Sequence, residues 1–384
     1  MKVALVTPGG VDRSGTERVI PCLLWLIERF VRAGVEVHVY ALRQEPEPGR
    51  WPLRGATVHN LGAGAGMPAL WRALAAEHRI GRFDLVHCFW ALPSGAAAAL
   101  PARLLGIPLL LTLPGGDLVC DRAIGYGARL RWRDRVRLRL IVVAARAVVV
   151  PCRAVRAQAA ALGITATRIA FGIATDDWPV RAPTPRDRAT PIRLLHVASL
   201  NPVKDQATLL AAMARLVARK VRFTLDIIGE DILAGAVQRQ AAALGLDDCI
   251  RFHGFLPHHA LRRRVEQADL LVMSSRHEGA PIVLLEAAVA GVPTVGTAVG
   301  NIAELAPHAA VAVPVGDSDA LADAVAALAQ DEDARLRMAH AAQRCALAED
   351  ADWSACQYLV LYRALAAPRS RARLASAEAA HAAL

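Results

Sequence analysis

The sequence lacks the patterns that would place it in an oxidising compartment, inside a membrane or among disordered proteins. Its seven cysteines are scattered without a C-x-x-C pair, which indicates reduced thiols and not a disulfide framework. The apolar stretches 85–102 and 140–150 are broken by Pro93 and Arg146, so neither is typical of a membrane span. The apolar run of residues 1–7 is too short for a signal peptide. We therefore expect a cytoplasmic protein that meets a membrane, if at all, from the side.

Acidic side chains are also in short supply. The chain has 35 aspartates and glutamates against 45 lysines and arginines, which gives a net charge of +10. This balance suits an anionic small ligand, an anionic lipid surface or nucleic acid, and charge alone does not choose among them. Hydrophobic residues make up 54% of the 384 residues, enough to fill the cores of two domains.

What the sequence does contain is a regular alternation of short apolar runs with helical patterns, which predicts parallel, doubly wound sheets. The segment 178–191 holds four prolines and interrupts the alternation, so we interpret it as a linker between two Rossmann-like domains. The first helix is expected over 15–32, opened by a capping box of Ser14 and Glu17 and bent at Pro21. The predicted strands are 2–7, 35–41, 57–61, 84–88, 108–112, 147–151 and 168–171 in the first half, and 192–197, 223–229, 250–254, 270–274, 294–296 and 311–313 in the second.

Two glutamates eight residues apart carry the sharpest functional signal. Glu278 precedes and Glu286 lies within a predicted helix that follows the strand 270–274. Ligands of doubly wound sheets bind beyond the carboxyl ends of strands, and a helix N-terminus is suited to a diphosphate. Eight residues return a helical side chain to within about 80° of its start and about 12 Å along the axis. One carboxylate can therefore meet a sugar while the other reaches a ribose. Two isolated glutamates would more often be solvated surface residues. Glu286, however, is embedded in the apolar run VLLEAAVAG, where a charge without a partner would be costly, so the pattern favours a functional role.

This segment resembles the E-x7-E signature of the family 4 glycosyltransferases, and three further motifs follow in the order of that family. Ser14-Gly15-Thr16-Glu17 is similar to its G-G-x-E element, and Leu113-Pro114-Gly115-Gly116-Asp117 to its H-G-x-D loop. The segment 197–205 is similar to its G-R-L-x-x-x-K-G turn, in which an arginine and a lysine hold the donor diphosphate. This chain departs from the pattern at three positions: Ser199 stands in place of that arginine, Pro114 in place of the histidine, and Ser14 in place of the first glycine of G-G-x-E, whereas Gly15 keeps the second.

The resemblance implies the GT-B fold, in which two Rossmann-like domains face each other across a cleft. Residues 1–180 would form the acceptor-side domain and 190–350 the nucleotide-sugar domain, with helix 352–367 packing back on the first. The implied activity is retaining transfer of a hexose or N-acetylhexosamine from a UDP- or GDP-sugar to a hydroxyl of a glycan or lipid-linked acceptor. No cofactor, metal or nucleic acid is expected. Catalytic roles are implied for Glu278 and Asp117, and donor-binding roles for Gly15, Ser199, Lys204, Pro281, Ile282, Val283 and Glu286.

Two other functions stay open at this point: a nucleotide-sugar epimerase on the same fold, and a sugar-nucleotide-binding subunit without turnover. The E-x7-E pair argues against the epimerase, and the retained Glu278, Glu286 and Lys204 argue against the binding subunit.

The remaining sequence patterns are weaker, and we interpret them structurally. The glycine-rich 62–67 is expected to be a turn. His253, His258 and His259 lack a zinc-site spacing and are expected at the surface or in turns. The alternating arginines of 129–139 predict either a solvated helix, which we slightly favour, or a basic helix at a membrane surface.

Overall fold

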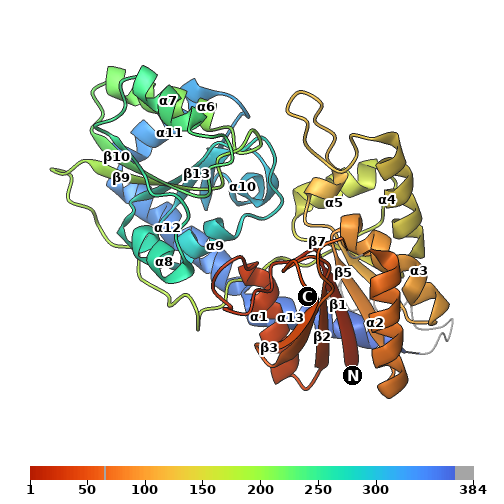
Figure 1. The fold of residues 1–384 in the computed structure, drawn as a ribbon. Coiled ribbons are helices and arrows are strands. Elements are labelled where there is room, and N and C mark those ends of the chain that lie inside the picture. The colour runs from red at the N-terminus through yellow and green to blue at the C-terminus, as the bar shows by residue number, and fades with distance from the viewer. Residues whose placement is uncertain (65, 368–384) are drawn as a thin grey trace.

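A computed structural model describes residues 1–64 and 66–367 and shows two α/β domains, each built on a parallel sheet (Figure 1). The strands of the first domain are β1 (Lys2–Thr7), β2 (Glu36–Ala41), β3 (Gly49–Leu53), β4 (Ala56–Asn60), β5 (Leu85–Phe89), β6 (Leu109–Thr112), β7 (Ala147–Val150) and β8 (Thr167–Arg168). Its helices are α1 (Pro21–Arg32), α2 (Met67–Ile80), α3 (Ala96–Leu104), α4 (Trp132–Ala144) and α5 (Arg153–Ala161), with the short helices η1 (Ala91–Gly95) and η2 (Gly116–Leu118).

The second domain begins after the proline-rich segment. Its strands are β9 (Ile192–Val197), β10 (Phe223–Ile228), β11 (Ile250–Phe252), β12 (Leu270–Met273), β13 (Thr294–Thr297) and β14 (Ala310–Val313). Its helices are α6 (Gln206–Ala218), α7 (Ala236–Ala243), α8 (His258–Gln267), α9 (Ile282–Val289), α10 (Gly300–Leu305), α11 (Ser318–Gln330) and α12 (Glu332–Ala348), followed by α13 (Ala351–Ala366).

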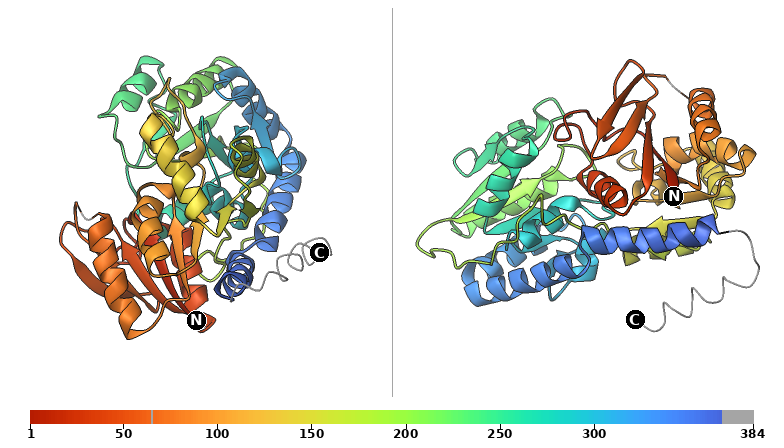
Figure 2. Two further views of the ribbon diagram at one scale, coloured as in Figure 1. Left: turned by 90° about the vertical axis from the view of Figure 1, so that its right-hand side faces the viewer. Right: turned by 90° about the horizontal axis from the view of Figure 1, so that it is seen from below.

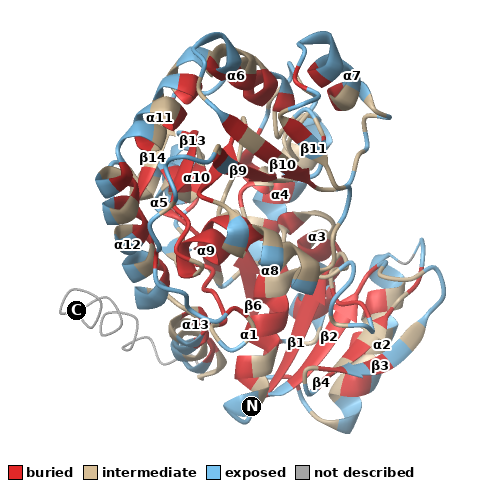
Figure 3. Cartoon of the chain, turned by 90° about the vertical axis from the view of Figure 1, so that its left-hand side faces the viewer, coloured by how far each residue is buried: buried red, intermediate tan, exposed pale blue. Residues whose placement is uncertain are grey.

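The order of the strands places the ligand crevice of each domain. The first sheet runs β3-β4-β2-β1-β5-β6-β7-β8, with only the edge pair β3 and β4 antiparallel among its pairings, and the second runs β11-β10-β9-β12-β13-β14 in parallel. Chain order therefore reverses between β1 and β5 and again between β9 and β12. Ligands of such sheets bind at this reversal, beyond the carboxyl ends of the strands. The strands pack as apolar runs in the buried interior, and α9 is buried as well (Figure 3).

The last helix, α13, returns to the first domain and runs beneath it (Figure 2, right). Tyr358 and Tyr362 are fully buried, and the Tyr362 hydroxyl and His87 Nδ1 form a hydrogen bond of 2.6 Å. The chain thus passes between the domains twice, and the two passages touch. A Cβ on Gly172 would lie 2.0 Å from the carbonyl carbon of Asp350, so only glycine allows this backbone contact.

The predicted start of the first helix is wrong by six residues, because α1 begins at Pro21, whose fixed φ suits a first helical turn. The Ser14 hydroxyl does accept a hydrogen bond from the Glu17 N–H, at 3.0 Å, but it closes an isolated turn. Arg18 then takes a φ of +48°, which no α-helix allows, so the turn and α1 are separate. The segment 14–20 is consequently a loop at the end of β1.

Candidate active site

The loops that follow β9 and β12 meet at the strand-order reversal of the second domain. The Lys204 ammonium lies 2.5 Å from Glu278 Oε1, and the Ser275 hydroxyl donates to the same oxygen at 2.6 Å. The Ser274 hydroxyl also donates to the Lys204 carbonyl at 2.8 Å, which ties the two loops together. A cation and a carboxylate 74 residues apart in sequence are therefore held as one pair at the floor of the cleft.

Helix α9 begins directly after this pair and presents one face to the cleft. Pro281 is its N-cap, and the first-turn N–H groups of Ile282 and Val283 are of the kind that attracts anions. Glu286 lines the same pocket of about 340 Å³ as Lys204 and Glu278. Glu286 is only 3% exposed, and the other buried residues of α9 are all apolar. Its carboxylate is therefore a buried charge at the edge of the pocket. The E-x7-E spacing thus brings both glutamates to one cavity.

His258, expected at the surface or in a turn, is partly exposed at the start of α8, and it also reaches the carboxylate of Glu286. Its Nε2 lies 3.4 Å from Glu286 Oε1, and its ring packs edge-on against Trp178 with centroids 5.0 Å apart. The Trp178 indole N–H also contacts His258 Nε2. No sequence signal distinguished His258 from its neighbour His259, because the contact depends on how α8 packs against α9.

The first domain faces this site with glycines and aromatic rings. Trp90, Pro114 and Tyr126 line a second pocket of about 310 Å³ together with Gly115 and Gly116. Lys204 and Glu278 line this pocket too, so they lie at the boundary between the two pockets. We call the face formed by Lys204, Ser275, Glu278, Glu286 and the start of α9 the second-domain wall. The first-domain wall comprises Trp90, Pro114, Gly115, Gly116 and Tyr126.

The backbones of the two walls touch at two glycines. A Cβ placed on Gly279 would lie 1.7 Å from the Pro114 carbonyl oxygen, and one on Gly115 would lie 3.2 Å from the Gly279 Cα. No side chain fits at Gly279 in this arrangement, because real Cβ atoms do not approach other atoms within 3.0 Å. The two domains are therefore in direct backbone contact at this point of the cleft.

A hairpin-like loop of the first domain reaches over the cleft beside this contact. Asp121 and Tyr126 pair through backbone hydrogen bonds of 2.8 and 2.9 Å. The Asp121 carboxylate lies 2.9 Å from His277 Nε2, and the Tyr126 ring stacks on the His277 ring with centroids 5.7 Å apart. The hydrogen bond from His277 is the main cause that holds the pKa of Asp121 below its usual range. Closure thus brings a residue adjacent to Glu278 against the first domain.

Asp117 lies behind the first-domain wall and does not line either pocket. It is 3% exposed, and its Oδ1 accepts a hydrogen bond of 2.9 Å from the Ala91 N–H. Its Oδ2 is buried without a partner among the described residues. Burial raises the pKa of this carboxyl from 3.8 to about 6. The contact joins η2 to η1 and so positions the loop that carries Trp90.

The motif 14–17 and the position of Ser199 give a mixed outcome. Gly15 closes a turn with Asp12 and is not among the pocket-lining residues, whereas Thr16 and Arg18 line the pocket together with Lys204. Ser199 is exposed and is not among the pocket-lining residues, and its carbonyl accepts from the Gln206 side chain at 3.2 Å. The structure therefore brings a cation that the sequence interpretation missed, Arg18, to the pocket from the opposite domain.

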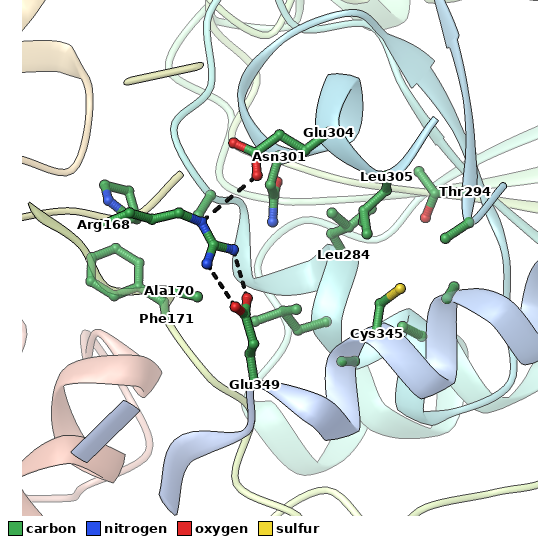
Figure 4. A pocket seen from close by; sticks show the side chains of 17 residues that line it. Arg168, Ala170, Phe171, Leu284, Thr294, Asn301, Glu304, Leu305, Cys345 and Glu349 are labelled. Atoms are coloured by element: carbon green, nitrogen blue, oxygen red, sulfur yellow. Dashed lines mark hydrogen bonds and ion pairs between the residues drawn. The ribbon is translucent and has the colours of Figure 1, made fainter. Parts of the chain in front are cut away.

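The opposite face of α9 borders a smaller cavity of about 70 Å³ between the domains (Figure 4). Leu284, Leu285 and other apolar side chains form much of it. At its edge the Arg168 guanidinium forms two hydrogen bonds of 2.6 Å with Glu349, and Glu304 lies 3.8 Å away. The Glu304 carboxylate also accepts from the N–H of Ala154 at 3.1 Å, at the start of α5. We interpret this seam as a contact that holds the domains together.

Within residues 1–64 and 66–367, one group of side chains has metal-ligand chemistry: His38, His59 and Glu77. It lies in the first domain on β2, β4 and α2, away from both walls of the cleft. The Lys2 ammonium is 2.8 Å from Glu77 and so already supplies a positive charge there. The same described part of the chain contains no helix long and apolar enough to cross a bilayer.

Comparison with known proteins identifies the family. The model of the "Glycosyl transferase 4-like domain" matches residues 19–171, and that of "Glycosyl transferases group 1" matches residues 183–344. The 2-deoxystreptamine N-acetyl-D-glucosaminyltransferase of Streptomyces fradiae is 30% identical over 321 residues, which cover 77% of this chain and 73% of that protein. The chain belongs to the family 4 glycosyltransferases. The family that the sequence motifs resemble is therefore confirmed.

Other members of the glycosyltransferase family match over different lengths. The glycogen synthase of Mycobacterium tuberculosis is 34% identical over 189 residues, 49% of this chain, and this alignment spans less than half (45%) of that relative. Among solved structures, sucrose-phosphate synthase from Thermosynechococcus elongatus has a TM-score of 0.81 at 20% identity, covering 95% of this chain and 98% of that one. HepE of Anabaena, in complex with UDP and glucose, has a TM-score of 0.73 at 18% identity over 95% and 100% of the chains. These likenesses confirm the expected GT-B fold.

Proposed function

We propose that this chain is a retaining glycosyltransferase that transfers a sugar from a nucleotide-diphosphate donor to a hydroxyl of a glycan or lipid-linked acceptor. The observation that carries the proposal is the contact between Lys204 and Glu278 at the strand-order reversal. A diphosphate next to Lys204 would place the donor sugar beside Glu278. Structures of the fold neighbour HepE in complex with UDP and with UDP-glucose support a nucleotide-sugar donor.

In the proposed reaction the bond between the anomeric carbon and the phosphate oxygen breaks, and the acceptor oxygen bonds to that carbon on the same face. The acceptor proton passes to the departing diphosphate oxygen. Negative charge on the diphosphate would be stabilised by Lys204 and by the first-turn N–H groups of α9. Positive charge on the sugar would be stabilised by the Glu278 carboxylate. No metal and no cofactor enters this proposal.

Two further groups complete the proposed donor site. Glu286 would accept hydrogen bonds from the ribose hydroxyls, because its carboxylate faces the pocket from the same helix whose start meets the diphosphate. Arg18 would supply the second cation for the phosphates, in the role that the family pattern gives to an arginine at the position of Ser199. Since Arg18 comes from the first domain, its contact with the donor would also favour closure.

Release of nucleoside diphosphate from UDP-, GDP- and ADP-sugars, measured with and without candidate acceptors, tests the proposal. We expect release that depends on an acceptor hydroxyl, with the anomeric configuration of the sugar retained in the product. An epimerase would convert the donor without releasing the nucleotide. A binding subunit without turnover would bind the donor and release nothing with any acceptor. Inversion of the anomeric centre would exclude the retaining mechanism.

A further inference from the structure

The first domain presents an unusual helix surface on the side turned away from the second domain. Helix α4 lies there beside α3 (Figure 2, left). Four of its apolar side chains point into solvent: Trp132 is 68% exposed, Val136 47%, Leu140 65% and Val143 83%. Large apolar side chains scattered singly on a surface are ordinary, but a contiguous row of them is not.

The four side chains form one stripe, because their spacings of four, four and three residues keep them within an arc of about 80° at 100° per residue. The buried residues of α4, Leu138 and Ile141, lie on the opposite side of the helix. The stripe is therefore the outward face and not an edge of the packed one. Nothing in the fold of the described residues explains why an apolar face should point away from the core.

Arginines flank the stripe on both sides. In the same helical projection Arg133 and Arg137 lie along one border and Arg135 and Arg139 along the other. Asp134 is the single acidic residue between positions 129 and 144, and it pairs with Arg137 at 2.9 Å. A row of apolar side chains bordered by cations is the pattern of a helix that lies in the interface of an anionic bilayer.

An apolar groove beside α4 is also consistent with a lipid surface. It has a volume of about 500 Å³ and is lined mostly by apolar side chains of η1, α3 and α4, among them Pro93, Leu100 and Leu140. Leu140 belongs to both the stripe and the groove, so the two surfaces are continuous. Pro93 lies in η1, three residues after Trp90 of the first-domain wall. The groove therefore borders η1, the short helix that begins directly after Trp90.

We propose that the outward face of α4 docks on an anionic lipid surface, with Trp132, Val136, Leu140 and Val143 entering the interface and the flanking arginines contacting lipid phosphates. The adjoining groove then receives the hydrocarbon chain of a lipid-linked acceptor. Docking does not depend on the proposed function, whereas delivery of an acceptor from the membrane rests on it. The charge pattern selects a lipid surface over a protein partner, because both borders of the stripe carry the same sign along its length.

Sedimentation of the full chain with vesicles of phosphatidylglycerol or of phosphatidylcholine tests the docking. We expect binding to phosphatidylglycerol at low salt that weakens as salt rises, and much weaker binding to phosphatidylcholine. Arg133→Gln with Arg139→Gln should weaken binding to phosphatidylglycerol about thirtyfold, since each arginine near such a surface contributes about a factor of five. Trp132→Ser with Leu140→Ser should weaken it at least about tenfold.

The matched control is Ile232→Ser with Val217→Ser, two exposed apolar residues of the second domain, which should bind vesicles like the unmodified chain. All substituted positions are exposed, and thermal melting confirms that each variant folds. Unmodified chain that stays in solution, or stripe and control variants that bind equally, would overturn the proposal. Self-association that the stripe variant abolishes, without vesicle binding, would instead make this face an interface between copies. UDP binding measured on the same samples reports on the cleft, so a failure of docking and a failure of the proposed function are told apart.

Discussion

The two walls of the cleft differ in the chemical groups that they present. The second-domain wall carries the charges, with Lys204, Glu278 and Glu286 lining one continuous space. The first-domain wall offers backbone and rings, and the carboxylate of Asp117, buried behind it, accepts from the Ala91 N–H. Arg18 also comes from the first domain, but it lines the charged pocket from a separate loop. We therefore expect the second-domain wall, together with Arg18, to act on the donor, and the first-domain wall to shape the space. Substitutions in the two walls should then fail in different ways.

The largest effect is expected from Glu278→Gln. If Glu278 attracts the positive charge that develops on the sugar, its contribution grows toward the transition state. Loss of a charge-assisted contact of about 3 kcal/mol should lower kcat by about two orders of magnitude. Steady-state kinetics at saturating acceptor and calorimetric titration with donor would measure this, with donor affinity staying within about threefold.

Glu286→Ala is the contrast within the same wall. The ribose changes little between ground state and transition state, so this substitution should raise the donor KM about tenfold and leave kcat within about threefold. If Glu278→Gln turned over normally while Glu286→Ala lost kcat, the roles assigned to the two glutamates would be reversed. If neither substitution mattered, the proposed catalytic site would be wrong.

The next effect concerns the phosphate cations on the two sides of the cleft. Lys204→Ala and Arg18→Ala should each weaken nucleoside-diphosphate binding by about 10- to 100-fold, since each removes a hydrogen bond to a charged group. Nucleoside-monophosphate binding should change far less. Lys220→Ala, two residues beyond the far end of α6, is the matched control. Equal losses for diphosphate and monophosphate with Arg18→Ala would place its guanidinium away from the distal phosphate.

The smallest effect on turnover is expected from Asp117→Asn, which keeps an oxygen for the Ala91 N–H. Its signature is the pH dependence of stability. Because the folded-state pKa is raised from 3.8 to about 6, the folded wild type holds a proton that the unfolded chain loses, and its stability falls as pH rises through this window. The asparagine variant lacks this loss, so its stability relative to wild type should rise by about 2.4 kcal/mol between pH 4 and pH 8.

Melting temperatures of both proteins at the two pH values would measure this gain. A constant difference between variant and wild type across pH would mean that Asp117 is ionised in the same way in both states. If Asp117→Asn instead lost kcat as severely as Glu278→Gln, the carboxylate would reach the reacting atoms and the division between the two walls would not hold.

Sequence reasoning worked best where the site is local in sequence. Glu278 lies in the loop that leads into α9 and Glu286 lies within α9, so their spacing alone predicts that they line one pocket. It worked poorly where packing decides. His258 reaches Glu286 through the packing of α8 on α9, and Arg18 lines the pocket from the loop that precedes α1, a segment that was predicted to be helical. The outward direction of the α4 stripe also depends on which residues of α4 are buried. None of these follows from periodicity.

The contact between Gly172 and Asp350 has a mechanical consequence. Two separate links between the domains would prevent free rotation if they lay far apart, but here both passages of the chain run through one point. Opening of the cleft is then a hinge rotation about this contact, in which the parts of the domains that lie farthest from the hinge move the most. The loop of Asp121 and the backbone contact at Gly279 would separate in one concerted swing, so substrate entry and product exit depend on the same movement. A larger side chain at position 172 would force the two passages of the chain apart at the hinge. It would therefore alter substrate entry and product exit together.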